Sequence, residues 1–262
     1  MNIHSFSRKK SAREKISMVT CYDHWSAKIL NDTDVDCILV GDSLAVVVHG
    51  FDSTVHATIE MMELHVAAVR RGAPDKFIVA DMPFLSCSKG VQHAMENVHR
   101  LMRAGANAVK IEGDTHQVPV IQHIVESGVP VMGHLGLTPQ SIHNLGGHKV
   151  QGKDEKRASV ITDAARALEA AGCFAIVLEC VPVKLGSCIT RSVQVPTIGI
   201  GAGPHTDGQV LVLQDLLGVD PEFKPKFLRR YANTRDLLKG AVNHFHADVV
   251  QGEFPSLAES YQ

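Results

Sequence analysis

The sequence lacks the features that would place it in a membrane, secreted or nucleic-acid-binding class. No run of about 18 uncharged apolar residues occurs, so no transmembrane helix is expected. The residues after Met1 are polar and basic, and no apolar segment of a signal peptide follows them. The formal net charge of -2 provides neither a basic stripe for nucleic acid nor a polybasic membrane anchor. We therefore expect a cytoplasmic protein that binds neither nucleic acid nor a membrane.

The cysteines lack the spacing of a metal or redox site. They include no CxxC pair and no zinc-ligand pattern, and several lie inside apolar runs. Reduced and mostly buried thiols are expected, because disulfides are rare in reducing compartments. The six positions are Cys21, Cys37, Cys87, Cys173, Cys180 and Cys188.

What the sequence does contain is clearest at residues 107–112, an otherwise apolar run with one cation and one carboxylate. Side chains two apart in a β-strand point to the same face, so Lys110 and Glu112 project together. An unpaired charge buried in a strand carries a high free-energy cost. We therefore expect this pair at the end of a strand, above a polar site.

A unit of helix, glycine and apolar strand recurs along the chain. Before residues 107–112, apolar residues recur at helical spacing from Val91 to Met102, and Gly105 follows as a C-terminal stop. A loop rich in glycine, asparagine and histidine is expected over residues 137–152. The expected strands are residues 16–20, 36–42, 76–81, 107–112, 129–134, 173–179, 195–199 and, with the weakest pattern, 216–219.

Nearly continuous apolar strands that alternate with helices are typical of a parallel sheet covered by helices. About eight strands in 262 residues favour a closed (β/α)8 (TIM) barrel, an α/β fold, over an open sheet. No change of composition marks a second domain. We therefore predict one domain over residues 1–262, with a short N-terminal segment and a helical C-terminal extension. In such barrels the active site lies where strands end, which is where we expect Asp42, Asp81, Lys110, Glu112, His134 and Glu179.

Each of these residues has a purely structural alternative. Asp42 and Asp81 could cap the helices that follow them. His134 could be a hydrogen-bonded core histidine, and Lys110 a buried ion-pair partner. Six titratable groups from five strands at one rim are nevertheless hard to attribute to capping and pairing alone, so a functional site is expected.

These residue types favour metal-assisted chemistry on a small anion. Three carboxylates without a Cys or His cluster suit a hard divalent cation, Mg²⁺ in the first instance. Lys110 and Ser43 suit a small anion beside it. A metal and a cation at one place suit a 2-oxo acid, whose polarised carbonyl makes an enolate accessible once a base is present.

Eight short runs follow one another between residues 16 and 227. They are VGDSL at 40–44, AAVRRG at 67–72, ADMPF at 80–84, RAGAN and VKIEG within 103–113, GHLGLTPQ at 133–140, LECVP at 178–182 and IGIGAG at 198–203. Together they resemble the ketopantoate hydroxymethyltransferase (3-methyl-2-oxobutanoate hydroxymethyltransferase) family, and the run from His134 to Gln140 is the most specific.

The resemblance implies a (β/α)8 barrel that joins the methylene of 5,10-methylenetetrahydrofolate to 3-methyl-2-oxobutanoate, giving 2-dehydropantoate on the route to pantothenate and coenzyme A. It implies a Mg²⁺ site formed by Asp42, Asp81 and Glu112. It also implies that Asp42, Ser43, Asp81 and Lys110 hold the 2-oxo acid.

The resemblance further implies that Glu179 is the base that removes the C3 proton, with His134 as a supporting polar group. It implies a homo-oligomer, a decamer built as rings of five. Two positions depart from the family pattern: Ala45 replaces a glycine, and Val55-His56-Ala57 replaces a Leu-Pro-Val-like run. Both lie in the loop after the second strand, whose shape they affect.

Two alternatives remain at this point. One is a metal-dependent barrel enzyme of the isocitrate lyase and phosphonopyruvate mutase type, which shares the carboxylate-rich rim and would not need folate. The other is a non-catalytic barrel, whose expected mark is the loss of one or more rim charges. All the rim charges are retained in this sequence.

Overall fold

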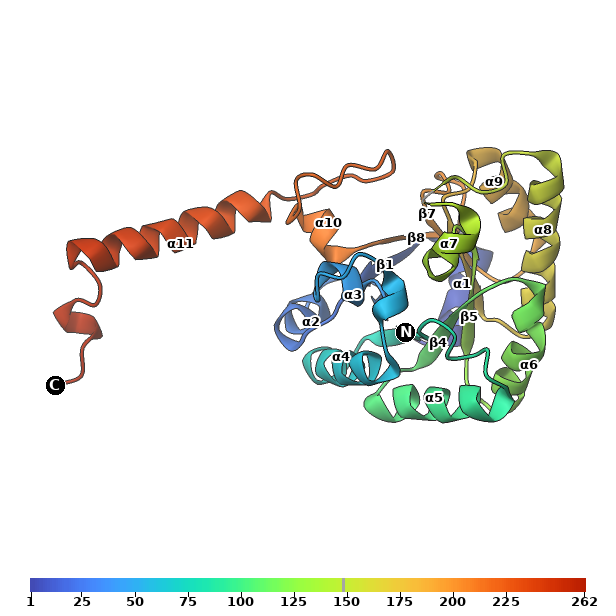
Figure 1. The fold of residues 1–262 in the computed structure, drawn as a ribbon, viewed down its shortest axis with the longest axis horizontal. Helices are drawn as coiled ribbons and strands as arrows, with labels where there is room; N and C mark the ends of the chain where they lie inside the picture. The colour runs from blue at the N-terminus through green and yellow to red at the C-terminus, as the bar shows by residue number, and fades with distance from the viewer. Residues whose placement is uncertain (148) are drawn as a thin grey trace. The chain divides into compact units, whose positions relative to one another are not determined.

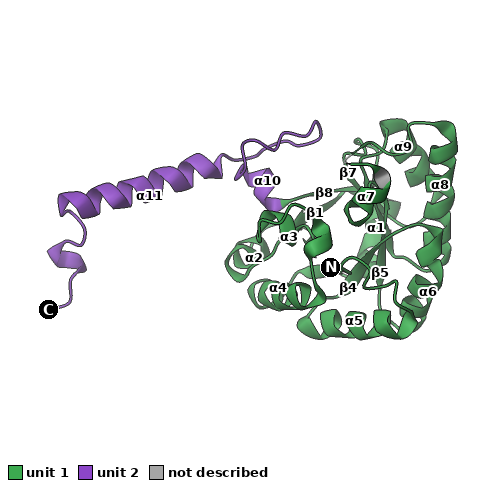
Figure 2. Ribbon diagram, in the orientation of Figure 1, with its two compact units in different colours: residues 1–212 green, residues 213–262 purple. Residues whose placement is uncertain are grey.

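The computed structural model describes residues 1–147 and 149–262, and these form two compact units, Met1–Val212 and Leu213–Gln262 (Figure 2). The first unit is a closed barrel of parallel strands in sequence order, with helices around its outside (Figure 1). This confirms the predicted fold class. The strands are β1 (Ile16–Thr20), β2 (Cys37–Val40), β3 (Phe77–Asp81), β4 (Ala108–Glu112), β5 (Val131–Gly136), β6 (Ala175–Glu179), β7 (Thr197–Ile200) and β8 (Gly208–Leu211).

Side-chain caps begin two helices of the first unit, and the glycine expected as a stop ends a third. The Asp23 side chain caps α2 and the Thr58 side chain caps α4, each by accepting a backbone N–H. Gly105 ends α5 with φ 115°, a conformation that L side chains rarely adopt. The helices of the first unit are α1 (Ile3–Ala12), α2 (His24–Asn31), α3 (Leu44–Val47), α4 (Ile59–Gly72), α5 (Val91–Ala104), α6 (Val118–Glu126), α7 (Ile142–Leu145), α8 (Glu155–Ala170) and α9 (Val183–Ser192).

Strand β8 corrects the sequence prediction. Residues 216–219 are not a strand, because residues Leu213–Leu217 form the helix α10, and the barrel closes instead through Gly208–Leu211. The strand pairs with β1, with Ile16 opposite Gly208, and with β7. A Cβ on Gly208 would lie 2.5 Å from the backbone oxygen of Ile16, so only glycine allows this close approach. The prediction failed because β8 is short and contains an exposed Gln209, whereas the leucines of α10 give the stronger apolar signal.

The loops around the barrel mouth contain short helical turns. The loop after β2 forms α3 and the 3₁₀ turn Thr54–His56. Ala45, which stands where the family pattern has a glycine, is buried in α3, and its helical backbone does not require glycine. The loop predicted over residues 137–152 contains α7 and the 3₁₀ turn Pro139–Ser141. His148 of that loop lies outside the described residues.

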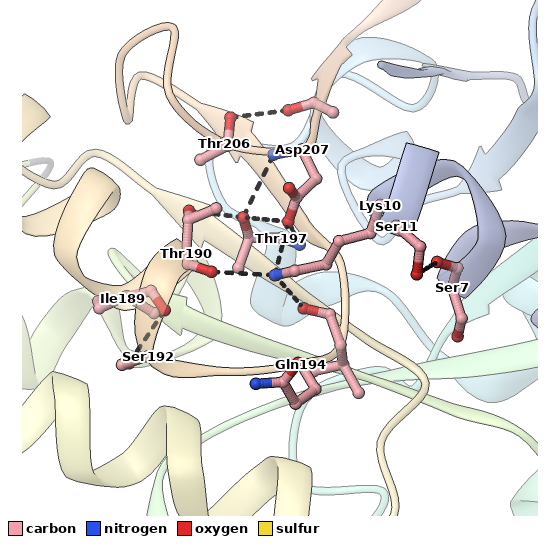
Figure 3. Close-up of polar contacts among 12 residues, drawn as sticks. Ser7, Lys10, Ser11, Ile189, Thr190, Ser192, Gln194, Thr197, Thr206 and Asp207 are labelled. Carbon is pink, nitrogen blue, oxygen red and sulfur yellow. Dashed lines mark hydrogen bonds and ion pairs between the residues drawn. The ribbon is translucent and has the colours of Figure 1, made fainter. Parts of the chain in front are cut away.

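The opposite end of the barrel is closed by α1. Phe6 is fully buried, and its ring contacts Phe77 and Phe174 edge to face at centroid distances of 5.4 and 5.1 Å. Lys10 adds a polar tie: its Nζ donates to the carbonyls of Thr190 and Val195, each at 2.9 Å, and pairs with Asp207 Oδ2 at 3.0 Å (Figure 3). The site expected at the C-terminal ends of the strands is therefore at the open end.

The inward-pointing residues of the strands line first the apolar core of the barrel and then, near the strand ends, the expected site. Every second residue of a strand points inward, and the apolar core uses Met18, Leu39 and Ile198 in this way. Near the strand ends the same inward positions become charged. The pairs of successive inward residues are Val79 and Asp81, Ala108 and Lys110, Met132 and His134, and Val177 and Glu179.

The second unit contains α10 (Leu213–Leu217), α11 (Thr234–Gln251) and the 3₁₀ turn Leu257–Glu259. Within it, Thr234 Oγ1 donates to the Leu217 carbonyl at 2.7 Å. No residue of α11 is buried. None of the helices in the described parts of the chain is long and apolar enough to cross a membrane.

Candidate active site

The strand register brings the predicted site residues together at the mouth of the barrel. Asp81 of β3 lies opposite Lys110 of β4, and Glu112 of β4 lies opposite His134 of β5. Gly136 of β5 lies opposite Glu179 of β6. The titratable groups that the sequence placed at separate strand ends are therefore neighbours.

Lys110 lies at the centre of this cluster. Its Nζ is 2.8 Å from Asp81 Oδ1, 3.1 Å from His134 Nδ1 and 3.9 Å from Glu112 Oε1, with the lysine side chain only 4% exposed. Burial alone would lower the pKa of Lys110, but the neighbouring carboxylates outweigh it, and the pKa is raised. Lys110 is therefore a fixed positive charge at neutral pH.

His134 joins the cluster to Glu179. Its Nδ1 lies 3.3 Å from Glu112 Oε1, and its Nε2 lies 3.2 Å from Glu179 Oε2. Burial and Lys110 lower the pKa of His134, but Glu112 and Glu179 more than compensate and raise it to about 9. His134 thus lies between the two glutamates, with one on each side of its ring.

Asp42 comes from the loop after β2 and completes the group of carboxylates. Its backbone N–H donates to Asp81 Oδ2 at 3.0 Å, which places the two residues side by side. Burial raises the pKa of Asp42 well above its usual range, and the charges of Asp81 and Glu112 raise it further. The buried site thus brings the carboxyl groups of Asp42, Asp81 and Glu112 together beside a single lysine.

Two residues outside the predicted set contact the site. Gln140 donates from its side chain to Asp42 and from its backbone to Glu112. The buried Tyr22 hydroxyl lies 2.8 Å from Ser43 Oγ, and no spacing in the sequence indicated this contact. Gln140 is the last residue of the run GHLGLTPQ at 133–140, the most specific part of the family resemblance. Its place in that run is the feature of the sequence that could have indicated a role in the site.

The oxygen atoms of Asp42, Asp81 and Glu112 are the candidate ligands for a cation. Within residues 1–147 and 149–262, no group of three or more His, Cys, Asp or Glu side chains is arranged to hold a metal ion as it stands. The chemistry of the donors nevertheless suits a hard cation, because Asp42, Asp81 and Glu112 offer only carboxylate oxygens. Burial, and after it the charges of Asp81 and Glu112, raise the pKa of Asp42, and a divalent cation bound among these groups would favour their ionised forms.

Comparison with solved structures shows the fold. A 2,3-dimethylmalate lyase, a PEP mutase/isocitrate lyase superfamily member, superimposes with a TM-score of 0.59 at 15% identity, covering 99% of this chain and 91% of that chain. A phosphonopyruvate hydrolase in complex with oxalate and Mg⁺⁺ gives 0.62 at 13% identity, covering 99% and 93%. At these identities the likeness concerns the barrel alone.

Comparison of sequences is more specific. A family model described as ketopantoate hydroxymethyltransferase matches residues 1–257. The 3-methyl-2-oxobutanoate hydroxymethyltransferase of Coxiella burnetii (strain RSA 493 / Nine Mile phase I) is 55% identical over 258 residues, which are 98% of this chain and 97% of that protein. That of Legionella pneumophila (strain Lens) is 52% identical over 262 residues, the whole of both chains.

These matches decide between the alternatives left open by the sequence. The lyase and mutase enzymes share the barrel with this chain, but not the high identity over its full length. The non-catalytic alternative does not hold against relatives that carry an enzyme name at this identity. The chain therefore belongs to the ketopantoate hydroxymethyltransferase family, and it is an enzyme that transfers a hydroxymethyl group to 3-methyl-2-oxobutanoate in pantothenate biosynthesis.

Proposed function

We propose that 5,10-methylenetetrahydrofolate is the one-carbon donor and that Mg²⁺ is the metal of this enzyme, with 2-dehydropantoate as the product. The observation that carries the proposal is the buried cluster in which Lys110 faces Asp81 and Glu112 beside a His134–Glu179 pair. The cluster offers separate places for an anion, a cation and a base, which the reaction requires.

Asp42, Asp81 and Glu112 would hold the Mg²⁺. All three are carboxylates, which suit this hard ion, and all three are buried. The distant phosphonopyruvate hydrolase is in complex with oxalate and Mg⁺⁺, which supports the binding of Mg²⁺ and of a small carboxylate on this fold. When bound, Mg²⁺ would polarise the carbonyl of the 2-oxo acid.

Lys110 and Ser43 would orient the carboxylate of 3-methyl-2-oxobutanoate, beside Asp42 and Asp81. The raised pKa of Lys110 keeps it charged, which suits electrostatic binding of an anion and not nucleophilic attack by a neutral amine. The Ser43 hydroxyl is held in place by Tyr22. Lys110 thus acts as a charge in this proposal.

Glu179 would be the base that takes the C3 proton. Both oxygens of Glu112 are engaged, Oε2 by the Gln140 backbone and Oε1 by His134, and its side chain is 4% exposed. Glu179 is 18% exposed, and in the described residues only its Oε2 is paired, with His134. One oxygen of Glu179 therefore remains available for a proton.

The balanced reaction uses one water. The C3–H bond breaks and the proton goes to Glu179, leaving an enolate of the oxo acid. Its C3 forms a bond to the folate methylene as one of the two C–N bonds of that methylene breaks. Water then replaces the second folate nitrogen and supplies the hydroxyl of the product, and the C3 proton and one water proton end on the two nitrogens of tetrahydrofolate.

The proposal is tested by NMR in deuterated water. With Mg²⁺ and 3-methyl-2-oxobutanoate alone, the C3 hydrogen should exchange for deuterium, and adding 5,10-methylenetetrahydrofolate should yield 2-dehydropantoate. Chelation by EDTA should stop both, and Mg²⁺ should restore them. Product formation that is unaffected by EDTA would contradict the proposed requirement for Mg²⁺. Cleavage of the oxo acid without folate would contradict 5,10-methylenetetrahydrofolate as the one-carbon donor.

We further propose that the enzyme assembles as a homo-oligomer, a decamer of two five-membered rings, in the cytoplasm. Support for assembly comes from α11, whose apolar residues Leu238, Val242 and Phe245 recur at helical spacing and are all more than half exposed. A second copy of this chain is the partner that would cover them. The six free cysteines suit a reducing compartment.

A further inference from the structure

The three carboxylates assigned to the cation share one feature: in each, a protein N–H holds one oxygen. Asp81 Oδ2 accepts from the Asp42 backbone at 3.0 Å. Asp42 Oδ2 accepts from Gln140 Nε2 at 2.8 Å, and Glu112 Oε2 accepts from the Gln140 backbone at 3.1 Å. Two of these three donors thus come from a single residue.

The second oxygens of two of these groups face the lysine. Asp81 Oδ1 lies 2.8 Å from Lys110 Nζ, and Glu112 Oε1 lies 3.9 Å from it. The N–H donors therefore hold one oxygen of Asp81 and one of Glu112, while the other oxygen of each lies on the side of the Lys110 ammonium. A cation that bound there would meet oxygens whose orientation is already set.

Gln140 reaches this position across the mouth of the barrel. It lies in the 3₁₀ turn Pro139–Ser141 after β5, and its Nε2 also donates to the Met82 carbonyl, just beyond β3, at 2.9 Å. One residue thereby connects the β5 loop with the ends of β2, β3 and β4. Both side-chain contacts use the same amide, so its orientation is fixed by two acceptors.

We propose that Gln140 is a positioning residue of the divalent-cation site, which orients Asp42 and Glu112 before the ion binds. The inference rests on the proposed function, because it assumes the divalent cation, and it adds Gln140 to the residues that form the cation site. An amide suits this task because it donates hydrogen bonds without a positive charge, and so does not compete with the ion as a lysine or arginine would. Without the Gln140 amide, Asp42 Oδ2 would lose the side-chain donor that fixes its orientation.

The test measures ion binding without substrate. Mn²⁺ is titrated into the enzyme, and the free ion is followed by electron paramagnetic resonance. Gln140→Met keeps the length of the side chain and the backbone N–H but removes the side-chain donor. We expect its Mn²⁺ dissociation constant to rise by about 10- to 100-fold, the usual effect of losing a residue that orients a metal ligand.

Gln151→Ala is the matched control, because the Gln151 side chain donates only to the nearby Lys149 carbonyl in the described residues. It should bind Mn²⁺ as the unmutated enzyme does. Circular dichroism melting of both variants shows whether the fold is kept. Gln140→Ala separates size from hydrogen bonding, since it should lose as much affinity as Gln140→Met.

Unchanged Mn²⁺ affinity in Gln140→Met would overturn the inference while leaving the proposed function intact. Loss in Gln140→Ala but not in Gln140→Met would also overturn it, because side-chain volume would then be the cause. Absence of Mn²⁺ binding to the unmutated enzyme would contradict the cation in the proposed function itself, and the inference would fall with it.

Discussion

At the scale of single residues, the different surroundings of two glutamates separate their roles. Glu112 and Glu179 both end strands, and both contact the same histidine ring. Glu112 is fully engaged and 4% exposed, whereas Glu179 is 18% exposed and paired through one oxygen. A base must reach the substrate with an unoccupied oxygen, so the structure favours Glu179 for this role.

The substitution Glu179→Gln should remove the base and keep the binding groups. We expect C3 hydrogen exchange with deuterated water to slow by about 10²- to 10⁴-fold, the usual contribution of a positioned acid or base. Binding of Mn²⁺ and of the oxo acid, measured by calorimetry, should persist because Glu179 is not among the proposed ligands. Exchange at the unmutated rate would transfer the role of base to another group, with Glu112 the next to test.

The substitution Asp81→Asn tests whether Asp81 is a direct ligand of the proposed Mg²⁺. The amide keeps the volume of the side chain, and Lys110 keeps Glu112 within 3.9 Å, so we expect the fold to survive. Mg²⁺ affinity, measured by titration calorimetry, should fall further than in the Gln140 variants, because a ligand and its charge are both lost. Unchanged affinity together with an unchanged melting temperature would remove Asp81 from the ion site.

At the scale of elements, strands place the chemistry and short segments complete it. The inward positions of β3 to β6 change from apolar to charged where the strands end, which gives the barrel a hydrophobic floor and a polar mouth. Helix α1 closes the other end through Phe6, and its Lys10 bonds to the Thr190 and Val195 carbonyls near β7. The aromatic closure by α1 and the proposed active site therefore lie at opposite ends of the barrel.

Phe6→Ala should lower the free energy of unfolding without changing the site. Phe6 is fully buried between two aromatic rings, and truncation of such a side chain costs about 3–5 kcal/mol. Urea unfolding followed by circular dichroism measures the loss, with the exposed His4→Ala of the same helix as control. A change below about 1 kcal/mol would contradict the proposed closure of the barrel by α1.

The helix α10 should be sensitive to pH through Asp215. Burial, followed by the charge of Asp220, raises the pKa of Asp215 to about 6, against the opposing effect of Arg230. The pKa of Asp215 is higher in the folded state than in the unfolded state, so the protonated carboxyl stabilises the folded state. This contribution to the free energy of unfolding is complete below the unfolded pKa and is lost as the pH rises through about 6. Hydrogen-exchange protection factors of α10 should therefore be higher at pH 5 than at pH 7.

In Asp215→Asn this difference should disappear, because the titrating group is gone. Protection factors, corrected for the intrinsic exchange rate at each pH, are the appropriate measure. If α10 loses the same protection between these pH values in the variant, another group causes the effect.

At the scale of the whole molecule, the chain consists of a complete barrel unit and a second unit with little core of its own. The barrel buries its apolar strands inside a closed cylinder. Helix α11, in contrast, buries none of its residues. An exposed apolar stripe of this kind is consistent with the proposed assembly, in which a second copy of the chain would cover it.

The proposed assembly predicts a position-dependent effect along α11. Phe245→Glu places a charge in the apolar stripe, whereas Asn243→Glu places the same charge on the opposite side of the helix. We expect the first variant to lower the molar mass measured by light scattering after size-exclusion chromatography, and the second to leave it unchanged. Equal masses for the unmutated chain and both variants would contradict a role of this stripe in assembly.

The sequence by itself determined the barrel and the rim of charged groups, because both follow from local rules. Alternation of inward residues and the position of strand ends depend only on near neighbours in the chain. Every predicted strand except the last was therefore close to its observed position. Strand β8 escaped because its four residues carry little apolar signal, and pairing with β1 at the far end of the chain makes it a strand.

Only the tertiary structure decided which groups touch and what each is free to do. Gln140 reaches Asp42 across 98 residues of chain, and no local pattern encodes such a contact. The strand ends showed that Glu112 and Glu179 lie at one rim, but the choice between them depends on the Gln140 backbone and on exposure. Charge balance and available oxygens are properties of groups that converge in space, so they exist only once the barrel has closed.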